Sequence, residues 1–248
     1  MGLSEPTIEP ETERLGMARR RRGGFRFWFR RVFWTLVILG LIPVVLTLVY
    51  LLPFIHPVST LMLKDLVTFQ GYDRQWVEFE DIAPVLVRSV IMSEDGQFCA
   101  HHGVDWAELK VVIDAALEGD ATRGASTIPM QTVKNLFLWH RPFGVVRKVL
   151  EVPLAVYFDV VLTKERIIEI YLNVAEWGPG IYGIEAAAQH HFGRSAAKLS
   201  PRQAALLAVT LPNPIDRDPA NPPAWMKRLA TIIERRAAAA DSHVACLE

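Results

Sequence analysis

The chain has very little cysteine, and one long stretch of it has no charge. Only Cys99 and Cys246 occur in 248 residues. They are far apart in sequence and match neither a metal-ligand set nor a disulfide framework, so we expect two free thiols. Residues 32–63 contain no Asp, Glu, Lys or Arg. Because residues 32–52 form an apolar run just longer than the ~20 residues needed to cross a bilayer as a helix, we expect a transmembrane segment there.

An excess of charge of one sign is also absent. The formal net charge is zero, although residues 1–31 carry eight Arg against four Glu. The remainder is too balanced for a nucleic-acid binder, so no nucleic-acid partner is expected. The arginines precede the apolar run, so the positive-inside rule predicts a cytoplasmic N-terminus and places the rest of the chain outside. No small-x-small cleavage site follows the run, which favours an uncleaved anchor.

The length leaves room for one domain of ordinary size behind this anchor. Residues 1–24 are polar and basic, which predicts disorder. We expect a cytoplasmic basic tail at 1–31, the anchor at 32–52, a membrane-proximal segment at 53–80, one domain at 81–240 and a C-terminal tail at 241–248. Apolar residues persist through the membrane-proximal segment, so it is expected to lie on the bilayer surface.

Helical signals dominate the expected domain. Asp105 and either Ser126 or Thr127 are candidate N-caps, and Ser200 with Gln203 forms a capping box. Strand-like alternation occurs only at 75–80. The fold class is therefore mainly α. Helices are expected from 81 or 83–84 to 93, from 105, from 126 or 127, over 145–161, 164–172 and 184–191, from 200, and over about 224–240.

Two carboxyls, Glu94 and Asp95, come at the end of an apolar helix and directly before Gly96. This position delivers them to the mouth of a loop, where a general acid or base is commonly held. A solvent-exposed acidic pair is the structural alternative. His101 and His102 have no partner at zinc-ligand spacing, so we assign them a structural role and expect no protein metal site.

A second cluster combines a helix N-terminus with a cation. Ser126 and Thr127 begin a helix on which Gln131 and Lys134 lie at i, i+3. Backbone N–H groups, hydroxyls and a lysine gathered in this way form an anion site. A helix cap alone would explain the two hydroxyls but not the Gln/Lys pair on an otherwise apolar helix.

The third cluster contains Arg147, Lys148 and Glu151, with the arginine and the glutamate at i, i+4. An ordinary surface salt bridge would have the same spacing. The neighbouring positions are apolar, which predicts a mostly buried helix. A cation pair beside a carboxylate on such a helix favours diphosphate recognition, with Glu151 as a second functional carboxyl.

Seven ordered motifs, which include these clusters, carry a family resemblance. The chain resembles the biosynthetic peptidoglycan glycosyltransferases, the family that also forms the polymerising domain of class A penicillin-binding proteins, and in particular its monofunctional, single-anchor members. The motifs are Glu-Asp-x-x-Phe-x-x-His-x-Gly at 94–103, Arg-Gly-Ala-Ser-Thr-Ile at 123–128, Gln-Thr-Val-Lys-Asn-Leu-Phe-Leu at 131–138, Arg-Lys-x-x-Glu at 147–151, Tyr-Leu-Asn-Val-Ala-Glu-Trp-Gly at 171–178, Gly-Ile-Glu-Ala-Ala-Ala at 183–188 and Leu-Pro-Asn-Pro at 211–214.

The resemblance implies a lysozyme-like helical domain on the periplasmic side of a bacterial cytoplasmic (inner) membrane. It implies an enzyme of cell-wall biogenesis that polymerises lipid II by inverting β-1,4 glycosyl transfer and releases undecaprenyl diphosphate. Its partners would be lipid II, the growing lipid-linked glycan strand and the membrane, with penicillin-binding proteins and other cell-wall machinery as further candidates. No tightly bound cofactor is implied, and a divalent cation (Mg or Mn) at the diphosphate is left open.

The resemblance also assigns residues. It makes Glu94 the general base, with Asp95 and His101 as its supports, and Glu151 the second essential carboxylate. The implied substrate-binding positions are Phe98, His101, Ser126, Thr127, Gln131, Lys134, Asn135, Arg147 and Lys148. The chain departs from the family pattern at Pro129-Met130, where a hydrogen bond to substrate is expected to be missing, and at His191 and Gln203.

Two other functions fit parts of the sequence. A membrane-anchored muramidase-type hydrolase would also use two carboxylates in a lysozyme-like frame, although cleavage of a glycan gives no use for a diphosphate site. A degenerate, non-catalytic scaffold for cell-wall assembly is favoured only by Pro129 and Met130.

Overall fold

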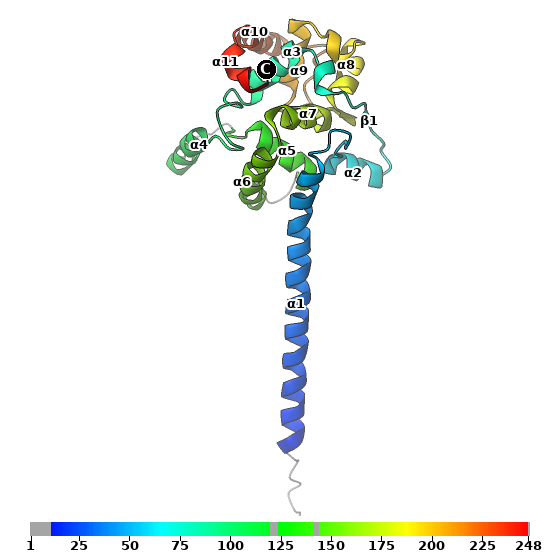
Figure 1. The fold of residues 1–248 in the computed structure, drawn as a ribbon, viewed down its shortest axis with the longest axis vertical. Coiled ribbons are helices and arrows are strands. Elements are labelled where there is room, and N and C mark those ends of the chain that lie inside the picture. The colour runs from blue at the N-terminus through cyan, green and yellow to red at the C-terminus, as the bar shows by residue number, and fades with distance from the viewer. Residues whose placement is uncertain (1–10, 120–123, 141–143, 248) are drawn as a thin grey trace, which may run out of the picture. The chain divides into compact units, whose positions relative to one another are not determined.

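The computed structural model describes residues 11–119, 124–140 and 144–247, with side chains described from residue 26 onward. It divides into two compact units, residues 1–45 and 46–248. The first unit consists of most of helix α1 (Glu11–Val49), drawn as one long helix in Figure 1. Within the described residues, one helical span, Arg26–Val49, is long and apolar enough to cross a membrane. Its apolar side chains are exposed, as at Trp28 and Leu36, so it is not a core helix, and it is compatible with a single-pass anchor.

Helix α1 begins earlier than the predicted anchor and continues through Pro43. The prediction of disorder over 1–24 is therefore wrong from Glu11 onward, and residues 1–10 lie outside the described residues. The physical reason is that residues 11–24 contain good helix formers such as Glu, Arg, Leu, Met and Ala. Extending an existing helix requires no new nucleation, so these residues can continue it even without packing.

The second unit is mainly helical, as predicted. Its long helices are α3 (Pro84–Glu94), α4 (Trp106–Glu118), α5 (Ile128–Phe137), α6 (Gly144–Val161), α7 (Lys164–Val174), α8 (Ile184–Phe192), α9 (Pro201–Thr210) and α10 (Ala224–Ala238). Asp105 and Thr127 are N-caps, and Ser200 and Gln203 form the predicted capping box. Shorter elements are α2 (Thr60–Val67), α11 (Asp241–Val244), and the 3-10 turns η1 (Phe79–Asp81), η2 (Ala196–Lys198) and η3 (Ala245–Leu247).

Helix α7 lies at the centre of this unit. All residues from Arg166 to Val174 are buried. Helix α5 packs against α6 and α7, while α3 packs against α9 and α10. Because α3 ends at Glu94 and α5 begins beside it, these two packed groups fix the positions of the predicted functional residues.

The structure contains a small sheet whose strands are too short to produce a recognisable sequence pattern. Strands β1 (Asp73–Arg74), β2 (Glu176–Gly178) and β3 (Ile181–Tyr182) have the order β1-β3-β2. Strand β1 is parallel to β3, and β2 is antiparallel to it. The strand expected over 75–80 is not formed, and part of it is the 3-10 turn η1. The alternation there has a packing origin, because Trp76, Val77 and Phe79 lie against the core.

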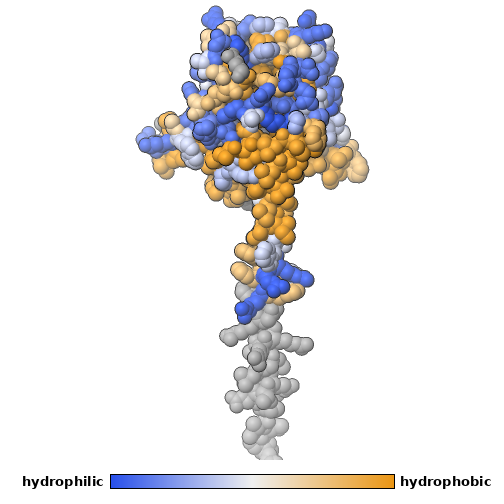
Figure 2. Space-filling view, in the orientation of Figure 1, coloured by the Kyte–Doolittle hydropathy of each residue, from blue (hydrophilic) through white to orange (hydrophobic). Residues whose placement is uncertain are grey.

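The membrane-proximal segment has an outward apolar side. Within α2 and the residue that follows its C-cap, Leu66, Val67 and Phe69 are exposed, and Phe69 is 95% exposed with a positive φ of 57°. The opposite side is tied to the domain because Asp65 accepts a 2.7 Å hydrogen bond from the Tyr182 hydroxyl. In Figure 2, hydrophobic surface gathers at one end of this unit. The prediction that this segment lies on the bilayer surface remains a prediction.

Two helices are less buried than their sequences suggest. None of the 13 residues of α4 is buried, although the sequence places an apolar stripe on it. On α6, Val145, Val146, Val149 and Val160 are exposed, so the prediction of a mostly buried helix is wrong for its outer face. Periodicity identifies an apolar face but not whether protein or lipid covers it.

The prediction of two free thiols is wrong. Cys99 and Cys246 form a disulfide across a sequence separation of 147, with a Cα–Cα distance of 5.6 Å. The pairing depends on the C-terminal segment folding back onto the domain, which spacing alone does not reveal. A link across a loop this long restricts the unfolded chain and typically adds about 2–4 kcal/mol to the free energy of unfolding.

Candidate active site

Glu94 is the last residue of α3 and is largely removed from solvent. Its Oε2 accepts a 3.2 Å hydrogen bond from Gln131 Nε2, and its Oε1 accepts one of 3.3 Å from Ser93 Oγ. Burial raises the pKa of this carboxyl above its ordinary value of 4.5, opposed by the hydrogen bonds and by the charges of Arg217 and Lys134. A carboxylate with few donors and a raised pKa is suited to accept a proton.

Asp95 is buried and fully engaged by protein groups. Both of its carboxylate oxygens lie 2.9–3.0 Å from His101 Nε2, and Oδ2 also accepts a 2.8 Å hydrogen bond from the backbone N–H of Ile128. Ile128 is the first residue of α5, so this carboxylate joins the loop after α3 to a helix N-terminus. Asp95 and His101 therefore position Glu94 and α5 relative to each other.

Gln131 connects Glu94 to the centre of the domain. Its amide nitrogen donates to Glu94 and also to the backbone oxygen of Ser126 at 3.3 Å. Its amide oxygen accepts a 3.0 Å hydrogen bond from the Tyr171 hydroxyl on α7. With the oxygen held by a donor, the NH₂ group must face the carboxylate, so Tyr171 fixes the orientation of the amide.

The cations of α6 converge on Glu151. Its Oε1 lies 2.9 Å from Arg147 Nε, and its Oε2 lies 3.2 Å from Lys148 Nζ. Lys148 also donates to Ser126 Oγ at 2.6 Å, and Arg147 donates to the backbone oxygen of His140 at 3.0 Å. The Glu151 side chain is almost fully buried, whereas both cations are partly exposed. The carboxylate thus holds two positive groups whose outer sides remain open to a ligand.

Lys134 supplies a third positive group, and its ammonium makes no hydrogen bond or ion pair with any residue that the structure describes. Burial lowers its pKa, as do the charges of Arg147 and Lys148, while Glu151 and Glu94 oppose the shift. It lines a cavity of about 170 Å³ together with Gln131, Asn135, His140, Tyr171, Glu176, Leu211, Pro212 and Pro214. A lysine in a polar cavity that has no ion-pair partner among the described residues is a natural binding group for an anion.

Comparison with known proteins gives the family. Residues 62–237 match the family described as transglycosylase. The chain belongs to the transglycosylase family. It is 66% identical over 236 residues to a protein of Mesorhizobium japonicum named biosynthetic peptidoglycan transglycosylase, which covers 94% of this chain and 100% of the relative. Proteins with the same name from Rhizobium meliloti (63% identity, 95% and 96% coverage) and Brucella suis (62% identity, 86% and 95% coverage) are also similar.

The transglycosylase brings many of the predicted residues together. Ser126, Gln131, Lys148 and Glu151 are linked to one another or to Glu94 by the contacts above, and Lys134 and Asn135 line the cavity. Arg123, part of one motif, lies outside the described residues. The substrate-binding roles predicted for these side chains remain predictions.

Other predicted substrate-binding residues form the scaffold of the transglycosylase site. Thr127 is buried, caps α5 and donates a 2.6 Å hydrogen bond to the backbone oxygen of Gly103. Gly103 has φ of +80°, and a Cβ there would lie 2.4 Å from the backbone oxygen of Ala155, so the close approach of this loop to α6 requires glycine. Phe98 is fully buried, with Lys164 Nζ 4.7 Å from its ring centroid.

The departures from the family pattern lie away from the described cavity. Pro129 and Met130 are buried, and Met130 is part of the core, so this side chain fills space in the domain instead of facing a ligand. His191 lines another cavity with Gly178, Pro179, Ile181 and residues 214–218, and Gln203 completes the capping box of α9. These positions give no structural reason to expect an inactive transglycosylase.

The structure adds three residues to the transglycosylase site that were not predicted from the sequence. Tyr171 orients Gln131, and Arg217 affects the charge state of Glu94 while donating a 2.6 Å hydrogen bond to the Val209 backbone oxygen. His140 lines the cavity, where burial and then the charge of Lys134 lower its pKa to about 4. Tyr171 lies within one of the motifs, which was a usable signal, whereas Arg217 and His140 lie outside them.

Proposed function

We propose that this chain is a peptidoglycan transglycosylase that polymerises lipid II into glycan strands by inverting β-1,4 glycosyl transfer, releasing undecaprenyl diphosphate. The observation that carries the proposal is the placement of Glu94 next to a cluster of cations. Glu94 bonds to Gln131, and Lys134, one turn further along the same helix, is close enough to both Glu94 and Glu151 to interact with their charges. A base and a diphosphate-binding group are the two requirements of this reaction.

In the proposed reaction, Glu94 accepts the proton from the 4-hydroxyl of the acceptor sugar. The deprotonating hydroxyl oxygen forms a bond to the anomeric carbon of the donor while the bond from that carbon to the diphosphate oxygen breaks. Direct displacement inverts the configuration at the anomeric carbon. Because Gln131 donates to Glu94 Oε2, one oxygen of the carboxylate is held and its angle toward the acceptor is fixed.

Negative charge that develops on the leaving diphosphate is stabilised by Lys134, Arg147 and Lys148. Arg147 and Lys148 are already held by Glu151, so little reorganisation is needed when charge develops. Lys134 lacks such a partner among the described residues, and its ammonium gains its counter-ion when the diphosphate binds. The lowered pKa of Lys134 in this cavity is expected to rise when the diphosphate binds.

The part of the chain that the structure describes contains no dedicated metal site. Within the described residues, no group of three or more His, Cys, Asp or Glu side chains is placed to hold an ion. Glu151, the carboxylate at the cation cluster, has both oxygens paired with cations. We therefore derive no step through a metal, and a Mg or Mn ion at the diphosphate would be held chiefly by phosphate oxygens and water.

The same proposal places the domain outside the inner membrane, in the periplasm, with the N-terminus cytoplasmic. The arginines before the apolar span support this orientation. The Cys99–Cys246 disulfide supports it independently, since disulfides persist in oxidising compartments such as the periplasm. Penicillin-binding proteins and other cell-wall enzymes would then be accessible as partners.

The test of this function separates synthesis from cleavage. Purified full-length protein in detergent is given lipid II in one reaction and preformed, uncross-linked glycan strands in another. We expect polymer from the first reaction and unchanged strands from the second, because the cation cluster serves a diphosphate leaving group that strands lack. Shortening of the strands without polymerisation would instead establish the muramidase-type hydrolase, and inactivity in both would favour a scaffold.

A further inference from the structure

We propose that residues 241–247, the C-terminal clamp, position the loop that directly follows the catalytic carboxylate, and that the Cys99–Cys246 disulfide locks the clamp to this loop. The loop consists of residues 95–103 and follows Glu94 directly. The inference rests on the proposed function for its catalytic consequence, but its structural part can be measured without any substrate. It assigns a positioning role to His243, Cys246 and Cys99, which lie outside the cavity and the cation cluster.

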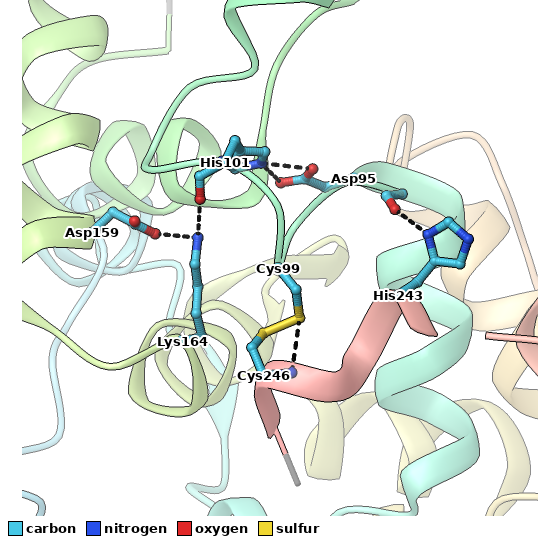
Figure 3. Close-up of a disulfide and its surroundings, with 8 residues drawn as sticks. Asp95, Cys99, His101, Asp159, Lys164, His243 and Cys246 are labelled. Atoms are coloured by element: carbon cyan, nitrogen blue, oxygen red, sulfur yellow. Dashed lines mark hydrogen bonds and ion pairs between the residues drawn. A yellow bond between two sulfur atoms is a disulfide. The ribbon is translucent and has the colours of Figure 1, made fainter. Parts of the chain in front are cut away.

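The clamp holds the loop at two points, which Figure 3 shows. His243 Nδ1 donates a 2.7 Å hydrogen bond to the backbone oxygen of Gly96, two residues after Glu94. The disulfide then fixes Cys99, and the backbone N–H of Cys246 donates to Cys99 Sγ at 3.4 Å. Gly96 and Cys99 follow closely after Glu94 in the chain, so a shift in the backbone of either residue would be transmitted to Glu94.

The clamp is itself held by the domain. Val244 is buried in the core, as is Ala240 directly before the clamp, and Asp241 accepts a 2.7 Å hydrogen bond from Arg88 Nη1 on α3. The turn η3 packs against α7. Because α3 carries Glu94 and α7 carries Tyr171, the clamp connects the loop to the two helices that supply the base and the residue that orients Gln131.

The two ends of the loop are held by contacts with residues of the active site. Asp95 and His101 bond to each other, and the backbone oxygen of His101 accepts a 2.7 Å hydrogen bond from Lys164 Nζ. Cys99 lies between Asp95 and His101 in sequence, so the disulfide acts on the middle of the segment whose ends form this pair (Figure 3). Release of the disulfide is expected to loosen the pair without removing any of its atoms.

The disulfide is accessible from outside. A cavity of about 410 Å³ lies between the loop and the clamp, lined by Gly96, Gln97, Cys99, His243 and Cys246 among others. A dithiol reductant can therefore reach the bond, giving two thiols on the protein and an oxidised reductant. Reduction and reoxidation change the link without any mutation, which makes the wild-type chain its own control.

The experiment compares oxidised protein, reduced protein and the Cys99→Ser/Cys246→Ser variant, all full-length and at a temperature well below their melting temperatures. We expect faster amide exchange in residues 95–103 once the link is lost. We also expect kcat for lipid II to fall roughly tenfold or more, with a smaller change in KM, because a misplacement of about 1 Å can cost about a hundredfold in rate. His243→Ala, with the disulfide intact, should produce a smaller change of the same kind.

Ile184→Ala provides the matched control, because this residue is buried on α8, a helix that packs chiefly against α7, the three strands and η2. It should lower the melting temperature yet leave exchange in residues 95–103 and kcat close to those of the wild type. If the link-free proteins show only a lower melting temperature, with unchanged loop exchange and kcat, the clamp is a general stabiliser and the proposal is wrong. If oxidised wild type makes no polymer, the proposed function fails while the exchange measurement still decides the clamp.

Discussion

Glu94→Gln is expected to abolish polymerisation of lipid II while leaving the domain folded. The substitution keeps the shape of the side chain but removes its capacity to accept a proton, and loss of a general base costs about 10²–10⁴-fold. The variant should melt at or above the wild-type temperature, because burial raises the pKa of Glu94 and thus disfavours its charged form. The measurement is polymer formed per unit time from lipid II, together with thermal melting.

The pH dependence of the same pair of proteins checks the role of Glu94. The raised pKa means that the wild-type kcat/KM should increase with pH through a value above 4.5, as the carboxyl loses its proton. Any residual activity of Glu94→Gln should lack this increase. Glu165→Gln, which changes an exposed carboxylate on α7, is the control and should retain both the rate and the pH profile. A folded Glu94→Gln protein with a near wild-type rate would exclude Glu94 as the base.

Glu151→Gln is expected to reduce both activity and stability. Its two oxygens hold Arg147 and Lys148, and a neutral amide cannot compensate two cations. Breaking a buried ion pair costs roughly 3 kcal/mol where the partners keep some contact with water. The loss of positioned cations should lower kcat about a hundredfold. Thermal melting and initial rates at saturating lipid II measure the two effects.

Glu169→Gln separates the two consequences. Glu169 forms a comparable buried pair with Arg166, with a distance of 2.7 Å, but neither residue lines the cavity. This variant should keep its kcat and lose little stability, because burial raises the pKa of Glu169 to about 7 and thus disfavours its charged form. If Glu151→Gln also keeps normal turnover, whatever its effect on stability, then Glu151 has only a structural role and the assignment to the leaving group is wrong.

The helices of this protein could be predicted well because several of them begin at residues whose side chains cap the first turn. Thr127, Asp105 and Ser200 each accept a hydrogen bond from a backbone N–H in the first turn, and such caps are visible in sequence. Strands of two or three residues contain no periodicity to detect, which is why β1, β2 and β3 were missed. The Cys99–Cys246 pair depends on contacts between distant segments, which have no local signal.

The candidate site was predictable in its residue types but not in its connections. Glu94, Lys134 and Glu151 stood out as charged positions beside apolar runs. Which of the predicted residues face the cavity and which only support those residues could be learned only from the structure. Asp95, Thr127 and Phe98 are buried in supporting contacts, whereas Asn135 lines the cavity. Tyr171 gained its importance only through the Gln131 amide oxygen that it binds.

The central claim is that one carboxylate drives a direct displacement of a lipid diphosphate. It is tested most directly by analysing the products of purified full-length protein acting on lipid II, using NMR for the new linkage and counting released undecaprenyl diphosphate. The account predicts a β-1,4 linkage of opposite anomeric configuration to the donor, with one undecaprenyl diphosphate released for each linkage formed. Retention of the donor's configuration, which requires a second displacement, or polymer formed without release of the diphosphate, would contradict it.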